Sequence, residues 1–253
     1  MKFVYLGSGS RGNCALVETD QGLIMLDCGF SLKETEKRLR RLGRRASDVT
    51  AVLVTHEHSD HISGVAPFAR RYRVPVWMTS GTYSAAKDKD IPNLHVFNCH
   101  RRFSLADVEV TPVPVPHDAR EPCQFVFRRQ SKSLGILTDV GHVTPHMVDS
   151  FSRLDALVLE CNHDLDLLSK GPYPQSLKQR VAGRWGHLNN DQAASMLKKV
   201  HHDHMQHVLA VHISEKNNTR TLAQTALARV LEADPSSVVA VDQDVESQWW
   251  TIE

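Results

Sequence analysis

The sequence has few of the features that mark membrane, secreted or disulfide-stapled proteins. No apolar run approaches the roughly 20 residues that a bilayer-spanning helix needs, and the N-terminus lacks the apolar length of a signal peptide. We therefore expect a cytoplasmic protein with no membrane partner. The five cysteines are odd in number and form no CxxC pair, which disfavours both a disulfide framework and a zinc ribbon. Each is expected to be a small buried side chain in a reducing compartment.

The sequence also has almost no excess of positive over negative charge, because its net charge is only +1. A protein that coats long stretches of nucleic acid usually has a stronger basic bias. One local basic run begins in the helix expected from Ser31. We favour a solvated face over a nucleic-acid-binding patch as its interpretation. Its members are Arg38, Arg40, Arg41, Arg44 and Arg45. Histidine, in contrast, is abundant at 15 residues, which invites a search for metal ligands.

The order of expected elements indicates an α+β protein with an αββα architecture, in which helices cover two mixed β-sheets packed face to face. We expect one domain over residues 1–253. The pattern of apolar residues and turn residues predicts helices and strands at the following places. Helices are expected at 31–42, 62–72, 177–182, 191–201 and 222–233, and strands at 3–6, 14–19, 23–26, 51–55, 74–78, 108–115, 124–127, 134–137, 156–159, 208–211 and 238–241. The prolines in 108–115 suggest an edge or a strand end.

The densest set of metal-ligand side chains follows the strand expected at 51–55. Within six residues the chain places His56, His58, Asp60 and His61. A loop at a strand end can aim several side chains at one point, and imidazole with carboxylate suits zinc, manganese or iron. Four such residues in a fixed order make an accidental polar loop a poor explanation.

This H-x-H-x-D-H order resembles the signature of the metallo-β-lactamase superfamily. The resemblance implies the αββα metallo-β-lactamase sandwich and assigns further ligands to His117, Asp139 and His212, each of which follows an expected strand. Asp27, after the strand at 23–26, matches the early aspartate that supports a ligand from behind.

Later motifs narrow the resemblance over essentially the whole chain to the YycJ/WalJ exonuclease subgroup, which is related to cyclic-phosphate phosphodiesterases and tRNA 3′-processing nucleases. These motifs are Glu160–Asp164, Gly171–Pro174, Gly186–Asn190 and His212–Asn218. The chain has Asn189 where members of the subgroup often have serine, a change that keeps the polarity. The resemblance implies a DNA 5′-to-3′ exonuclease linked to DNA repair.

The superfamily pattern also implies a role for each ligand. One divalent ion, Zn²⁺ or Mn²⁺ with Fe²⁺ as a further option, would be held by His56, His58 and His117. A second would be held by Asp60, His61 and His212, with Asp139 between the two; Asp60 also counts among the catalytic residues. Two such ions can share a hydroxide and stabilise displacement at phosphorus.

Five further residues are candidates for handling protons or phosphate. His187 is preferred over His163 as the acid for the leaving oxygen or as a phosphate contact, since a structural role for His163 is about as plausible. Ser214, Asn217 and Asn218 are neutral hydrogen-bonding residues suited to a phosphate.

Other functions remain open at this stage. The same metals could serve a small cyclic phosphodiesterase or a thioester or lactone hydrolase. A diiron redox protein is disfavoured because such relatives carry glutamate where this chain has His58, and a metal-free binding module conflicts with a complete ligand set.

The G-x-G-x-x-G pattern at 7–12 lacks the following helix of a dinucleotide site and is expected to form a tight turn near the metals. Nucleic acid, DNA rather than RNA, is the expected partner, and the oligomeric state, a homodimer included, stays open.

Overall fold

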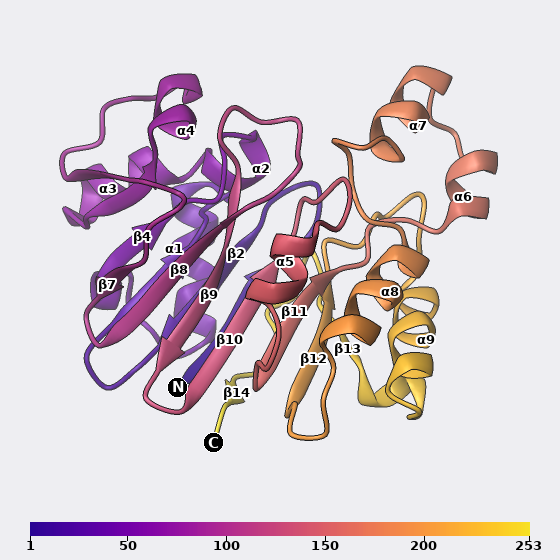
Figure 1. Cartoon of the computed structure of the whole chain (residues 1–253). Coiled ribbons are helices and arrows are strands. Elements are labelled where there is room, and N and C mark those ends of the chain that lie inside the picture. The colour runs from indigo at the N-terminus through magenta and orange to yellow at the C-terminus, as the bar shows by residue number, and fades with distance from the viewer.

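The computed structural model describes residues 1–253 and contains two seven-stranded mixed sheets packed face to face (Figure 1). The first sheet has the order β14-β1-β2-β3-β4-β5-β6 and the second the order β13-β12-β11-β10-β9-β8-β7. The strands of the first are β1 (Lys2–Gly7), β2 (Cys14–Glu18), β3 (Leu23–Leu26), β4 (Ala51–Leu53), β5 (Val76–Thr79), β6 (Leu94–Phe97) and β14 (Trp250–Thr251). Those of the second are β7 (Phe103–Leu105), β8 (Val108–Pro114), β9 (Cys123–Arg129), β10 (Lys132–Leu137), β11 (Ala156–Glu160), β12 (His207–Val211) and β13 (Val239–Ala240).

Helices cover the outer faces of both sheets, so the predicted αββα fold is confirmed. They are α1 (Leu32–Arg41), α2 (Ser59–Ile62), α3 (Val65–Tyr72), α4 (Ser80–Ala85), α5 (Pro145–Ser150), α6 (Leu165–Lys170), α7 (Gln175–Val181), α8 (Asn190–Val200) and α9 (Arg220–Val230), with two short 3₁₀ turns, η1 (Ala46–Asp48) and η2 (Pro235–Ser237). None of these helices combines the length and apolar character that crossing a bilayer requires. The organisation as one domain stays a prediction.

Three hydrophobic cores follow from this layering. The largest lies between the sheets and contains Phe3, Phe125 and Phe127, all fully buried. The second packs the other face of β10–β12 against α5, α8 and α9, and the third packs β1–β5 against α1 and α3. Because the central strands are buried on both faces, they appear in the sequence as continuous apolar runs. All five cysteines are free and buried, as expected.

The helix expected at 62–72 is instead broken into α2 and α3 at Gly64. The Gly64 N–H donates to the Cys28 carbonyl (2.7 Å), and a Cβ at this position would lie 2.1 Å from the carbonyl oxygen of Phe30. The loop after β3 therefore comes too close for a side chain, and the helix is interrupted where the two segments meet.

The prolines of β8 lie where one side of the strand has no partner. β7 pairs only with Val108, Glu109 and Val110, whereas β9 pairs along the strand as far as Pro114. Pro112 and Pro114 thus occupy an edge within a longer strand, as the sequence suggested, because proline cannot donate to a ladder.

The basic run around α1 is largely neutralised. Arg41, Arg44 and Arg45 pair with Glu246, Glu18 and Asp48. The expectation of a solvated face was wrong for Arg38, whose side chain is buried and donates to the carbonyl oxygens of Leu6 and Gln243. Ion pairing across this surface leaves little free positive charge for a nucleic acid.

Candidate metal centre

Strand ends bring the predicted ligands to one edge of the sandwich. Asp27 follows β3, Asp139 follows β10 and His212 follows β12. All three adopt left-handed backbone conformations, with φ of 57°, 54° and 53°. Such conformations are unfavourable for residues other than glycine and cluster at functional sites. The same sharp turn at three strand ends directs three acidic or imidazole side chains towards the space between the sheets' edges.

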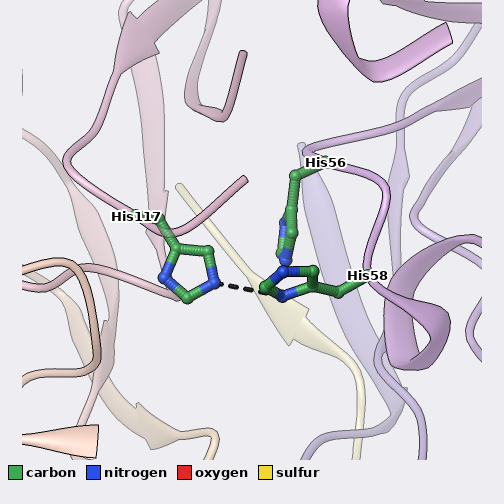
Figure 2. Close-up of side chains that lie close together, drawn as sticks. All are labelled: His56, His58 and His117. Carbon is green, nitrogen blue, oxygen red and sulfur yellow. Dashed lines mark hydrogen bonds between the residues drawn. The ribbon is translucent and has the colours of Figure 1, made fainter. Parts of the chain in front are cut away.

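The structure gathers the seven predicted ligands into overlapping groups whose donor atoms lie within 4.8 Å of one another. These groups are His56, His58 and His117; Asp60, His61 and His212; and His56, His61 and Asp139. Figure 2 shows the first group, whose three rings converge from two separate loops, with His117 Nε2 3.2 Å from His58 Nδ1. Two of these groups are the two expected ligand sets, and the third joins Asp139 to one histidine of each set.

Several donor atoms in this cluster are buried without a hydrogen-bond partner. They are His56 Nε2, Asp139 Oδ2 and His212 Nε2. Burying such polar atoms unpaired is costly, and a cation among them would satisfy all three. The nitrogen and oxygen donors also suit zinc, manganese or iron. The residues present therefore fit a divalent metal centre.

The electrostatics favour positive charge at the same place. Burial opposes protonation of His212, but Asp139, Asp60 and Glu160 outweigh it and raise the pKa of His212 to about 10. Burial likewise opposes protonation of His61, and carboxylates led by Asp139 and Asp60 raise its pKa well above the usual value. This surplus of negative charge would bind a divalent cation in place of protons.

Asp27 orients His61 from behind, as the resemblance implied. Its Oδ2 lies 2.7 Å from His61 Nδ1, and its other oxygen accepts the Thr55 N–H at 2.8 Å. Fixing Nδ1 in this way leaves Nε2 of His61 turned towards the cluster. Burial raises the pKa of Asp27, although His61 and Thr55 oppose that rise.

Glu160 is the functional residue to which sequence reasoning gave no role. Its side chain is fully buried, and Oε1 lies 2.8 Å from His187 Nδ1 and 3.0 Å from His212 Nδ1. Burial would raise its pKa, but His187 and His212 prevail and lower it to about 2. One carboxylate therefore orients two imidazoles. The sequence signal that could have identified Glu160 is its position as the last residue of the apolar strand β11. Asp27, Asp139 and His212 likewise lie just after strands.

The cavity above the cluster has a volume of about 210 Å³ and is lined by most of the remaining predicted residues. His187, Ser214 and Asn217 line it, as do Asp60, Asp139 and His212. Because Glu160 occupies Nδ1 of His187, the other ring nitrogen is free for a ligand in the cavity.

Two predicted residues lie elsewhere. His163 is fully buried, is absent from the cavity lining, and has both ring nitrogens unpaired; burial lowers its pKa to about 4. Asn218 exchanges side-chain hydrogen bonds with Asn190 and donates to the Cys161 carbonyl. This geometry favours a structural role for both residues over contact with a substrate.

The glycine-rich loop at 7–13 packs against the ligand loop. Asn13 N–H donates to the Asp60 carbonyl (2.7 Å), and Asn13 Nδ2 lies 3.2 Å from Asp60 Oδ2. Asn13 Oδ1 in turn accepts from Ser8 Oγ, and Ser8 Oγ accepts the His212 N–H. The loop thus fixes two ligand-bearing segments, as the tight-turn interpretation expected.

Gly29 allows this packing, and replacing it should disturb the metal centre. An alanine Cβ there would lie 1.8 Å from the Asp60 carbonyl oxygen and 2.8 Å from the Asn13 nitrogen, both of which are backbone atoms. The ligand loop must therefore shift. We expect Gly29→Ala to weaken metal binding by about 10–100-fold, as loss of supporting contacts around metal ligands does. Competition with a chromophoric chelator measures this.

Gly22→Ala is the matched control, because its Cβ would meet only side-chain atoms, the closest being the Thr50 hydroxyl at 3.0 Å. It should bind metal as the parent does, and thermal melting verifies that both variants fold. Parental metal affinity in Gly29→Ala would contradict the argument that this contact fixes the ligand loop.

Comparison with known proteins agrees with the fold. Residues 23–213 match the family model of the beta-lactamase superfamily domain. The protein is thus a hydrolase of the metallo-β-lactamase fold. The chain is 36% identical over 236 residues to exodeoxyribonuclease YycJ of Bacillus anthracis and 32% identical over 240 residues to exodeoxyribonuclease WalJ of Streptococcus pneumoniae; each alignment covers 92% of this chain and 89% of the relative. The chain therefore belongs to the YycJ/WalJ family within the β-lactamase superfamily.

Solved structures share the fold at low sequence identity. The metallo-β-lactamase-fold protein YhfI from Bacillus subtilis superposes with a TM-score of 0.75 at 14% identity and covers 97% of this chain and 98% of its own. The short form of human tRNase Z superposes with a TM-score of 0.66 at 16% identity over the whole of both chains. These similarities concern the fold alone.

Proposed function

We propose that this protein hydrolyses phosphodiester bonds in DNA as a two-metal 5′-to-3′ exonuclease. The observation that carries the proposal is the Glu160–His187 pair, which places an oriented imidazole in the same cavity as the metal-ligand cluster. A proton donor beside a cation site suits cleavage of an ester with a poor alkoxide leaving group. The names of the YycJ and WalJ relatives, both exodeoxyribonucleases, support DNA as the substrate.

Seven residues would hold the metal ions. His56, His58 and His117 form one set, Asp60, His61 and His212 the other, and Asp139 lies between them. Bound ions supply a nucleophile at neutral pH and stabilise negative charge on the phosphate. Zinc and manganese are our candidates, with Fe²⁺ as a third, in a cytoplasmic enzyme that acts in DNA repair.

The remaining cavity residues handle the substrate. His187, held at Nδ1 by Glu160, donates a proton from Nε2 to the leaving 3′ oxygen of the cleaved nucleotide. Ser214 and Asn217 also line the cavity, and their hydroxyl and amide N–H groups would hydrogen-bond the non-bridging phosphate oxygens. Ser214 Oγ accepts the Asn217 backbone N–H at 3.2 Å and lies 3.4 Å from Asn217 Nδ2, so the Ser214 hydroxyl hydrogen can be donated to a phosphate oxygen.

A chelation experiment tests the proposal. We expect EDTA to abolish hydrolysis of both a 5′-phosphorylated oligodeoxynucleotide and bis(p-nitrophenyl) phosphate, and Mn²⁺ or Zn²⁺ to restore it. Metal-loaded protein that cleaves neither substrate would contradict the proposal. Activity unaffected by chelation would contradict the role of the metal ions.

A thioester hydrolase is the second candidate, because the chain is also 31% identical over 163 residues to hydroxyacylglutathione hydrolase of Xanthomonas axonopodis, a match that covers 60% of each chain. A thiolate leaves without a proton donor, so the Glu160–His187 pair favours the phosphodiester. Turnover of an acyl-glutathione thioester without turnover of either phosphodiester would reverse this ranking.

A further inference from the structure

The second ligand set, which consists of Asp60, His61 and His212, is oriented from within the sandwich. Asp27 contacts Nδ1 of His61 at 2.7 Å, and Glu160 contacts Nδ1 of His212 at 3.0 Å. Both supporting carboxylates are buried, and they lie at the ends of the central strands β3 and β11. The support for these two imidazoles is therefore part of the sandwich itself.

The first ligand set, which consists of His56, His58 and His117, is supported by backbone carbonyl groups of two loops. His117 Nδ1 lies 3.0 Å from the Gly186 carbonyl oxygen, and His58 Nε2 lies 3.2 Å from the Asp118 carbonyl oxygen. Because a carbonyl oxygen can only accept, each of these ring nitrogens has the proton. The other two nitrogens, His117 Nε2 and His58 Nδ1, then face each other unprotonated at 3.2 Å (Figure 2), so a cation can bind both rings.

Asp118 is in turn held by the helix that projects from the sandwich. Its N–H donates to the Trp185 carbonyl at 3.0 Å, and its Oδ2 accepts from Arg180 Nε at 2.6 Å. Arg180 belongs to α7, which buries none of its residues and stands clear of the sheets (Figure 1). The carbonyl group that orients His58 is thus fixed by residues 180–186 and not by the core.

The carboxylate of Asp118 also lies beside the rings of the first set. Its Oδ1 is 3.6 Å from His58 Nε2 and 3.5 Å from His117 Nε2. A carboxylate close to the outward N–H of a metal-binding imidazole orients the ring and raises the basicity of its other nitrogen. Asp118 therefore supports His58 through its side chain as well as through its backbone.

Exposure to solvent distinguishes the two supports. The side chains of His58 and Asp118 are 28% and 29% exposed, whereas those of His61 and His212 are 1% and 4% exposed. Contacts that are open to water and anchored on a projecting helix are broken more easily than contacts inside the sandwich. The two ligand sets should accordingly differ in how firmly they hold an ion.

We propose that Asp118 is the positioning residue of the first ligand set and that Arg180 of α7 fixes it there. Affinity for the first ion then depends on residues 180–186, whereas affinity for the second ion depends on the sandwich. Loss of the Asp118 contacts releases the first ion and leaves the second bound. This inference rests on the two metal sites of the proposed function and goes beyond it, because it gives the two ions separate supports.

Titration with Co²⁺ tests the proposal without reference to hydrolysis. Visible absorption and competition with a chromophoric chelator report the affinity of each ion. In Asp118→Ala one ion should bind about 10–100-fold more weakly, the effect typical of residues that support metal ligands. The other ion should keep its affinity to within about twofold, the deviation expected between independent sites. In His56→Ala, which lacks a ligand of the first set, adding Asp118→Ala should change nothing further.

Graded variants separate support of His58 from a general loosening of the protein. Asp118→Asn keeps an oxygen near the ring and should lose less affinity than Asp118→Ala. Arg180→Ala should weaken the first ion by at most about fivefold, because its side chain is 61% exposed and exposed ion pairs contribute little. Arg102→Ala is the matched control, since it breaks an exposed pair with Glu109 of the β7–β8 hairpin; both ions should bind as in the parent.

Thermal melting in EDTA verifies that every variant folds. Equal weakening of both ions in Asp118→Ala, or parental affinity for both, would overturn the proposal. A parent protein that binds fewer than two ions would overturn it together with the two-metal centre. A parent that binds two ions but cleaves no phosphodiester would reject the proposed function alone, because selective loss of one ion in Asp118→Ala would still confirm the separate supports.

Discussion

Replacing Asp139 by asparagine should lower hydrolysis by on the order of 10³-fold or more, because losing a ligand exceeds the 10–100-fold typical of supporting residues. Asp139 is buried and has Oδ2 unpaired among imidazoles of both ligand sets. Burial alone would raise its pKa, but His212, His61 and His56 hold it well below the usual value. Asparagine keeps the shape and removes the charge that a cation needs.

Metal content by mass spectrometry, measured with the rate, checks this prediction. Asp149→Asn serves as the control, because Asp149 is exposed on α5 and makes no ion pair or side-chain hydrogen bond. It should keep the full metal content and activity. An Asp139→Asn enzyme that retains both would refute the assignment of Asp139 as a ligand between the two sets.

His187→Ala should lower kcat on DNA by about 10²–10⁴-fold, the usual contribution of a positioned acid, while metal content changes little. The loss should be much smaller on bis(p-nitrophenyl) phosphate, because p-nitrophenolate leaves without protonation. Comparing the two substrates therefore separates proton donation from a structural effect.

His146→Ala is the matched control, since His146 is exposed on α5 and its ring makes no hydrogen bond. It should leave both rates unchanged. Glu160→Gln should show the same leaving-group dependence as His187→Ala, because Glu160 acts through the imidazole that it orients. Equal losses on DNA and on the nitrophenyl ester in His187→Ala would rule out its role as the acid.

The sequence predicted the layers of the fold and the gathering of candidate ligands at strand ends, because both depend on local patterns. Apolar runs identified the central strands, and His56, Asp139 and His212 stood out as polar residues just after such runs. The parallel strand pairs then bring these ends together, as β10, β11 and β12 do in the second sheet.

What the sequence did not predict depends on contacts between distant segments. Glu160 has a role only because His187 and His212, 27 and 52 residues away, both lie against it. Gly64 breaks a helix because of the loop at Phe30. Arg38 is buried because it donates to the carbonyls of Leu6 in β1 and of Gln243 in the loop between β13 and β14. Asn218 pairs with Asn190 for the same kind of reason. Side-chain chemistry alone suggests ligands and charged patches, whereas packing decides which of them face the cavity.

Digestion of DNA labelled separately at its 5′ and 3′ ends tests the central claim most directly. With Mn²⁺ or Zn²⁺ present, the 5′ label should appear at once as a mononucleotide while the 3′ label persists in a ladder of shortening fragments, and EDTA should stop both. Release of the 3′ label first, or internal cuts without end-directed shortening, would contradict a 5′-to-3′ exonuclease, and DNA left intact by the metal-loaded protein would contradict a deoxyribonuclease altogether.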